Sequence, residues 1–213
     1  MSKGTDIDEK SYAMTALLVF ALDRIVVVVL NLLRGGMAPS DRMLWLNATT
    51  LVFSWAMPLI VVSRIEKRDA GSLGVAVSKE RRRLYALYLL VGVVLPMMFF
   101  RSVEEYFTEL LEQVVFIGFA EEFFFRGYMM TRFCAWLGET EGLLLNAFVF
   151  SLAHAVFVAS RYGLAYPLLL AQSSLQTFAG GLLLGYIFLR SRSILLGSIL
   201  HTSLNLSLPR ILG

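Results

Sequence analysis

A short run of charged residues lies inside a long apolar stretch of the carboxyl-terminal half. Glu121, Glu122 and Arg126 are all part of it. On a helix, Glu122 and Arg126 are four residues apart, which is the spacing at which an acid and a base form an ion pair. Glu121 points about 100° away on the same helix. The pair can therefore neutralise one carboxylate and leave the other free for chemistry.

The chain has only two histidines, and both also lie in apolar stretches. His201 and Asn205 are four residues apart, so that an imidazole and an amide project from one helix face as neighbouring donors, as an oxyanion requires. His154 belongs to a different stretch. If its helix packs against the helix of Glu121, the carboxylate and the imidazole could hold one water between them. These residues predict attack of water on an amide carbonyl.

Composition predicts that the elements that position these residues lie in a membrane. Apolar and aromatic residues make up 57% of the 213 residues and charged residues 16%, whereas soluble domains carry about 25% charged residues. This balance excludes a soluble enzyme, a disordered tail and a collagen-like repeat, and the net charge of +3 does not indicate a nucleic-acid partner. The expected fold is an all-α, polytopic transmembrane helical bundle with an intramembrane polar cavity.

Because a span needs about 20 residues, the length allows about seven spans with short connections. Asp23 and Arg24 interrupt the first span, which either hides them in the bundle or consists of two shorter helices. A basic loop is expected over 63–83 and an amphipathic interfacial stretch over 102–112. The three phenylalanines at 123–125 favour lipid-facing bulk over a substrate path. The expected spans are 12–33, 43–62, 84–100, 110–137, 142–160, 162–189 and 193–209.

The distribution of Lys and Arg predicts the orientation. Most of the 19 fall on one face of the seven-span arrangement, the face that carries the basic loop. The positive-inside rule therefore places the amino terminus in the cytoplasm of a multi-pass protein of the cell membrane. We expect residues 1–108 to supply amino-terminal spans and the loop, and residues 109–213 to form the catalytic helical core.

The polar residues also match known motifs. Residues 121–126 read EEFFFR and match EExxxR, residues 150–154 match FxxxH, and residues 201–205 match HxxxN, in this order. Together they resemble the CAAX protease and bacteriocin-processing family, also called the ABI family, of intramembrane glutamic proteases, and in particular its type II CAAX endopeptidases. The resemblance implies that Glu121 and His154 activate water without a metal or cofactor. It also implies that His201 and Asn205 stabilise the oxyanion, and that Glu122 and Arg126 brace the site.

Other interpretations stay open at this point. The two histidines and a carboxylate could bind catalytic zinc, although the histidines lack the four-residue spacing of helical metalloproteases. The same residues could hold helices together in a catalytically silent scaffold, immunity or regulatory protein. The expected partners are the lipid bilayer and a peptide or lipidated, membrane-associated protein substrate. The substrate's identity and the oligomeric state do not follow from the sequence.

Overall fold

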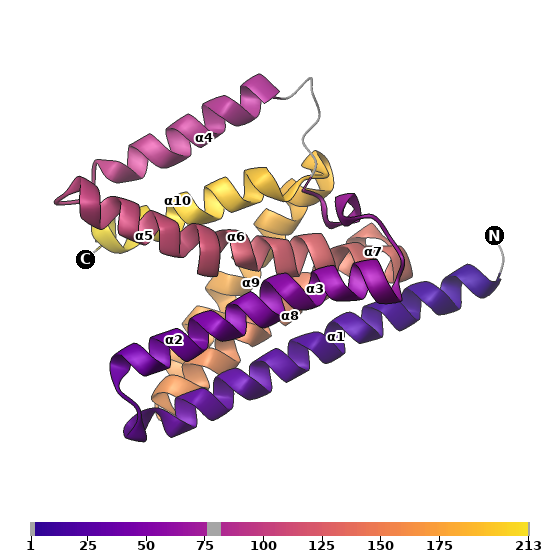
Figure 1. The fold of residues 1–213 in the computed structure, drawn as a ribbon, viewed down its shortest axis with the longest axis horizontal. Coiled ribbons are helices and arrows are strands. Elements are labelled where there is room, and N and C mark those ends of the chain that lie inside the picture. The colour runs from indigo at the N-terminus through magenta and orange to yellow at the C-terminus, as the bar shows by residue number, and fades with distance from the viewer. Residues whose placement is uncertain (1–2, 76–81, 213) are drawn as a thin grey trace.

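The computed structural model describes residues 3–75 and 82–212, and every regular element in these ranges is helical. Figure 1 shows a bundle in which α1 runs beside the α2–α3 rod, while α4 lies at the opposite edge next to α10. The longer helices are α1 (Lys3–Leu32), α4 (Arg82–Met97), α5 (Val103–Phe116), α8 (Glu139–Tyr162), α9 (Pro167–Ser191) and α10 (Ile194–Leu212). The shorter ones are α2 (Pro39–Thr49), α3 (Met57–Ile60), α6 (Gly118–Glu121) and α7 (Thr131–Leu137). Single-turn 3-10 helices cover Leu33–Gly36 and Ala70–Leu73.

Three π-helical segments join some of these helices into longer rods. Segments η2 (Thr50–Ala56) and η3 (Val61–Ile65) make the chain helical from Pro39 to Ile65. Segment η6 (Glu122–Met130) joins α6 to α7. The basic loop therefore begins after Ile65, slightly later than predicted, and its Lys79 and Arg81 lie outside the described residues.

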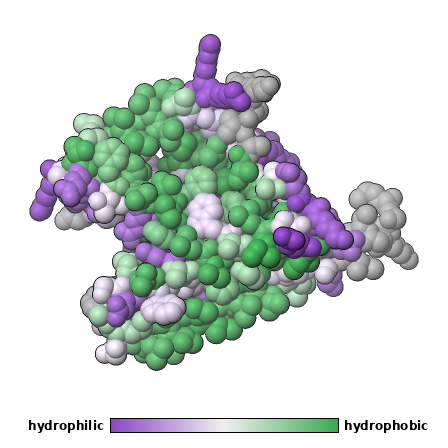
Figure 2. All heavy atoms as spheres, in the orientation of Figure 1, coloured by the Kyte–Doolittle hydropathy of each residue, from purple (hydrophilic) through white to green (hydrophobic). Residues whose placement is uncertain are grey.

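Within the described ranges, four helical stretches are long and apolar enough to cross a membrane, namely Asp8–Leu32, Ser40–Ile65, Glu139–Tyr162 and Pro167–Ser191. They match four of the seven expected spans. The apolar part of α4 is shorter, covering Tyr85–Met97. Figure 2 shows hydrophobic residues over most of the displayed face and hydrophilic residues towards its edges. The all-helical membrane bundle predicted from the sequence is confirmed.

The prediction of one continuous span over 110–137 is wrong. Helix α5 ends at Phe116, and Ile117 has φ −123° and ψ −92°, which is not helical. A new helix starts at Gly118, where a Cβ atom would lie 2.6 Å from Thr202 Oγ1 and 3.2 Å from the Thr202 backbone nitrogen. The chain therefore changes direction at the point where it packs closely against α10. A hydrophobicity pattern alone does not reveal such a break.

Helix α1 keeps its charged pair inside the bundle, which was the first of the two alternatives. It is continuous from Lys3 to Leu32, and the Asp23 side chain is buried in an ion pair with Arg24. The Asn31 amide donates to the Ser160 hydroxyl of α8 at 3.0 Å. The Asn31–Ser160 bond fixes the register of α1 against α8.

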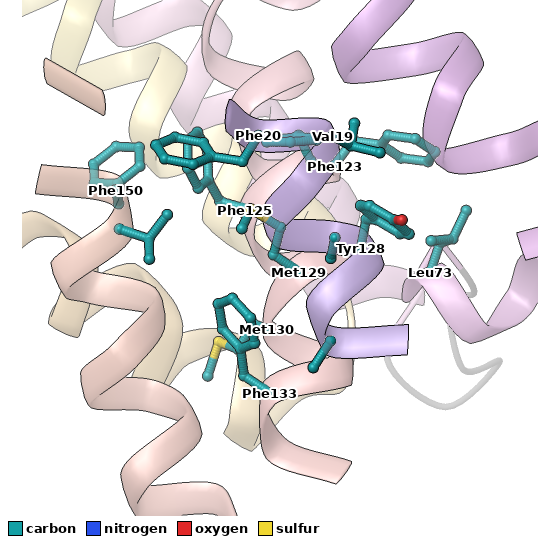
Figure 3. Close-up of a cluster of buried hydrophobic side chains, with 14 of the residues drawn as sticks. Val19, Phe20, Leu73, Phe123, Phe125, Tyr128, Met129, Met130, Phe133 and Phe150 are labelled. Carbon is teal, nitrogen blue, oxygen red and sulfur yellow. The ribbon is translucent and has the colours of Figure 1, made fainter. Parts of the chain in front are cut away.

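The core is rich in aromatic side chains and surrounds the η6 segment (Figure 3). Phe123, Phe124 and Phe125 are buried in it, so the prediction that they face lipid is wrong. The Phe125 ring meets the Phe20 ring of α1 at 6.2 Å and the Phe150 ring of α8 at 4.9 Å, both edge to face. Three helices are thus locked together around the segment that carries Glu121 and Glu122.

Glycines allow close contacts between α7, α8 and α9. A Cβ atom on Gly181 would lie 3.0 Å from Ala147 Cα, and one on Gly185 would lie 2.5 Å from Leu143 Cδ1. These two glycines let α9 pack closely against α8. At Gly142, a Cβ atom would meet the Cys134 backbone nitrogen at 2.6 Å.

We expect Gly142→Ala to destabilise the bundle by about 1–3 kcal/mol, because the added methyl group overpacks the contact between α7 and α8. Gly180→Ala is the matched control, since a Cβ atom there meets nothing within 4 Å. The control should leave stability unchanged or raise it by up to about 1 kcal/mol through helix propensity. Denaturant unfolding in detergent micelles measures both variants. Equal stabilities would contradict the close packing at Gly142.

Candidate active site

The Glu121 side chain stands one helical turn after the break at Ile117. The indole Nε1 of Trp55 donates to the Val115 carbonyl at 2.8 Å, so the last turn of α5 is tied to the α2–α3 rod. The Trp55 ring also stacks on the rings of Phe119 and Phe123, at 5.6 and 4.9 Å. The break is therefore held from both sides, and the start of the Glu121 helix is fixed in the bundle.

The π-helical segment η6 follows directly and is buried throughout. A π-helix bonds i to i+5 and is frequent at functional sites. The Asn146 amide donates to the Phe125 carbonyl at 2.8 Å, and the Thr131 hydroxyl donates to the Gly127 carbonyl at 2.7 Å. Side chains thus satisfy carbonyls of the widened helix. The sequence held one signal for this, because Asn146 is a lone amide in an otherwise apolar run.

Beyond η6, a buried arginine clamps the segment to the start of the basic loop. The Arg132 guanidinium donates to both carboxylate oxygens of Glu66, Nε to Oε1 at 3.1 Å and Nη2 to Oε2 at 2.6 Å. Both side chains are almost completely buried. This bidentate pair fixes the end of η6 that lies away from Glu121.

Glu122 and Arg126 form the ion pair expected from their spacing. Arg126 Nη1 lies 3.0 Å from Glu122 Oε1, and both side chains are buried. The guanidinium lies over the Phe150 ring, 4.3 Å from its centroid. Glycine at position 197 leaves room for the carboxylate, because a Cβ atom there would lie 2.9 Å from Glu122 Oε2. The pair thus holds the Glu122 carboxylate in a fixed position next to His201.

Glu121 lies between the two histidines. Its Oε2 atom is 4.0 Å from His154 Nε2 and 3.8 Å from His201 Nε2. The side chain is 26% exposed, against 1% for Glu122. Within the described ranges, Oε2 itself is buried and has no hydrogen-bond partner. The structure therefore brings one free carboxylate and two imidazoles from three separate helical segments to one point.

The second ring nitrogen of each histidine contacts a group that can only accept a hydrogen bond. His154 Nδ1 lies 2.9 Å from the Phe150 carbonyl, and His201 Nδ1 lies 3.1 Å from Glu122 Oε1. A carbonyl and a carboxylate both require a proton on Nδ1. In the neutral tautomer, both Nε2 atoms thus present a lone pair towards Glu121.

Asn205 is one turn beyond His201 on α10. Its Nδ2 donates to Gln113 Oε1 of α5 at 2.9 Å. Within the described ranges, no contact joins the Asn205 side chain to Glu121 or to either histidine. Gln113 was not among the residues predicted from the sequence; it follows the stretch expected to be interfacial and lies near the start of the expected span over 110–137. It orients the Asn205 amide from a different helix.

A cavity of about 350 Å³ opens at this cluster. Glu121 and His154 line it, together with Phe124, Phe125 and residues of α1, α2, η2 and α5. Asp23 and Arg24, which had no assigned role, are part of its wall. A volume of this size lies at the lower end of the range of ligand sites, about 300–1,000 Å³. Within residues 3–75 and 82–212, no group of three His, Cys, Asp or Glu side chains is arranged to hold a metal ion.

An all-helical bundle with apolar helices of membrane-spanning length and a buried polar cluster defines this protein as an integral membrane protein. A family model described as type II CAAX prenyl endopeptidase, Rce1-like, matches residues 84–207, which is more than half of the chain. The chain belongs to this Rce1-like family, and the resemblance drawn from the three motifs is confirmed. Neither the comparison with curated proteins nor that with solved structures gives a match.

The matched range spans all seven fixed residues of the three motifs and supports a protease function. It begins at residue 84, so it also takes in most of α4 and the first turns of α5, which lie in the part predicted to supply the amino-terminal spans. The division of the chain between residues 108 and 109 stays a prediction.

Proposed function

We propose that this protein is an intramembrane glutamic endopeptidase that cleaves a peptide bond near the carboxyl terminus, or in a membrane-proximal part, of its substrate. The position of Glu121 Oε2 carries the proposal, since this atom has no hydrogen-bond partner among the described residues and lies 3.8 and 4.0 Å from two imidazole nitrogens. A water about 2.8 Å from each atom fits these distances. It would have three polar partners, which is typical of a bound water.

In this mechanism, Glu121 and His154 act on the water. His154 Nδ1 donates to its own helix, so Nε2 accepts a hydrogen bond from the water and orients it. As the water oxygen bonds to the substrate carbonyl carbon, its proton passes to Glu121, which acts as the general base. When the carbon–nitrogen bond breaks, Glu121 returns the proton to the leaving amine. The products are a new carboxyl terminus and a free amine.

His201 and Asn205 stabilise the negative charge that develops on the carbonyl oxygen. With Nδ1 donating to Glu122, His201 donates from Nε2 only when the ring carries both protons, and two carboxylates surround it to support that form. The Asn205 amide nitrogen has two hydrogens, and one of them bonds Gln113. The other can reach towards substrate. Glu122 and Arg126 hold His201 in place rather than touching the reacting atoms.

The substrate we propose is a protein or peptide with a prenylated cysteine near its carboxyl end, because the matching family model is described as a prenyl endopeptidase. Aromatic side chains on one wall of the cavity suit an apolar substrate. The reaction needs neither a metal nor another cofactor. We further propose that the protein resides in the cell membrane with its amino terminus in the cytoplasm, as the distribution of basic residues predicts.

The direct test is to reconstitute the purified full-length protein in liposomes with a farnesylated peptide that ends in a CAAX sequence. Mass spectrometry of the products should show cleavage after the modified cysteine. Chelator titration in the same assay distinguishes a zinc-dependent reaction from the proposed metal-independent one. In the zinc-dependent case, activity falls with the metal content. No cleavage, together with a cellular phenotype that His154→Ala preserves at normal abundance, would overturn the proposal in favour of a scaffold.

A further inference from the structure

The Asp23–Arg24 pair lies in the wall of the cavity that holds Glu121 and His154. It belongs to α1, which is outside the residues matched by the family model. A charged pair in the middle of an apolar helix is costly and marks a functional position by default. The proposed hydrolysis uses neither residue.

Among the described residues that line the cavity, Arg24 is the only arginine or lysine, and His154 is the only histidine. Three carboxylates line the same cavity, those of Asp23, Glu112 and Glu121. An anionic group that enters would therefore be repelled by Glu112 and Glu121, and the Arg24 guanidinium, which already pairs with Asp23, is the one arginine or lysine group among the described lining residues that it can bind. The distribution of charge therefore favours an anionic group bound at Arg24 over one bound beside Glu121.

The Arg24 guanidinium has a free edge. Its Nε donates to Asp23 Oδ2 at 2.8 Å, and its Nη2 contacts the same oxygen. Within the described ranges, Nη1 has no hydrogen-bond or ion-pair partner. The Arg24 side chain is 23% exposed, whereas that of Asp23 is 6% exposed. Asp23 thus holds one side of the planar fork and leaves the edge between Nη1 and Nη2 for a second carboxylate, the group that this fork binds best.

We propose that Arg24 binds the free carboxyl terminus of the peptide substrate and so determines how many residues are released. This inference rests on the proposed peptidase function and adds the group that recognises the end of the chain. Three residues beyond the cysteine of a CAAX sequence span at most about 10 Å. Glu121 and Arg24 line the same cavity, so the scissile bond, the released segment and its terminal carboxylate would all lie within it.

The test compares two farnesylated peptides of the same sequence, one with a free terminal carboxylate and one with a terminal amide. We expect the wild-type protein to have a kcat/KM about 10-fold to 100-fold higher for the free acid, as for a charge-assisted bond. Arg24→Gln should bring this ratio close to one, mainly through KM for the acid. Because Arg24→Gln leaves the buried Asp23 carboxylate without its partner, the double variant Asp23→Asn with Arg24→Gln serves as a second measurement with no unpaired charge.

Arg190→Gln is the control, because this arginine lies at the exposed end of α9 and bonds Tyr186 outside the cavity. It should keep the wild-type ratio. If the wild-type protein cleaves both peptides equally, or if the Arg24 variants keep the preference, the role of Arg24 is wrong while the peptidase function stands.

If the wild-type protein cleaves neither peptide, the peptidase function fails. The role of Arg24 is then decided by the binding of the two fluorescent peptides to the protein in liposomes. A preference for the acid that disappears in the Arg24 variants supports carboxylate recognition. No preference, or one that persists in the variants, overturns it.

Discussion

Glu121→Gln should lower kcat for peptide cleavage by about 10²-fold to 10⁴-fold, the range of a lost general base. Glutamine keeps the size of the side chain but cannot take the proton of the attacking water. KM should change little, because Glu121 acts on the water and not on the substrate chain. The comparison uses single-turnover rates in liposomes, with circular dichroism to show that the variant is folded.

Glu141→Gln is the matched control for this substitution. It makes the same chemical change at the exposed start of α8, the helix that carries His154. It should cleave at the wild-type rate. If Glu121→Gln retains full activity, Glu121 is not the base and the glutamic mechanism is wrong, even if cleavage itself is observed.

Arg126→Met should destabilise the bundle by about 3–5 kcal/mol, because it removes the guanidinium that is ion-paired with the buried Glu122 carboxylate. Both side chains are buried, so water cannot replace the lost partner. Domains are stable by only about 5–15 kcal/mol, and we therefore expect a large loss of folded protein as well. Denaturant unfolding in micelles gives the free energy.

The double variant Glu122→Gln with Arg126→Met separates the charge from the packing. Removing both charges should recover most of the lost stability, since an apolar replacement of a buried pair is often neutral. Activity should stay low, because His201 Nδ1 no longer has a carboxylate beside it. If the double variant is as unstable as Arg126→Met, lost packing against the Phe150 ring explains the defect instead.

Some parts of the site follow directly from spacing. The Glu122–Arg126 pair needs only a helix and a separation of four residues, and it is present. The convergence of Glu121, His154 and His201 could be expected because polar groups are costly in an apolar bundle unless they pair with one another. The identity of their second partners could not be predicted. His154 contacts the Phe150 carbonyl of its own helix, whereas His201 contacts a carboxylate 79 positions earlier in the sequence.

The fold was predictable where hydrophobic length decides it, as in α8 and α9. It was not predictable where close packing decides it. The break at Ile117 depends on Gly118 meeting the backbone of Thr202, a contact between distant parts of the chain. The burial of Phe123 to Phe125 depends on helices α1 and α8 covering them, which composition does not specify. The role of Gln113 depends on where α5 places it next to α10.

The π-helical segment acts as an angular spacer between two anchored ends. Glu121 precedes it and lines the cavity, and Arg132 follows it and forms an ion pair with Glu66. Deleting one residue from Glu122–Met130 would permit ordinary α-helical bonding, yet it would twist one end relative to the other by about 100°. Either the carboxylate would then swing away from the histidines or the arginine would leave its clamp. The extra residue of the π-helix therefore allows Glu121 and Arg132 to keep their partners at the same time.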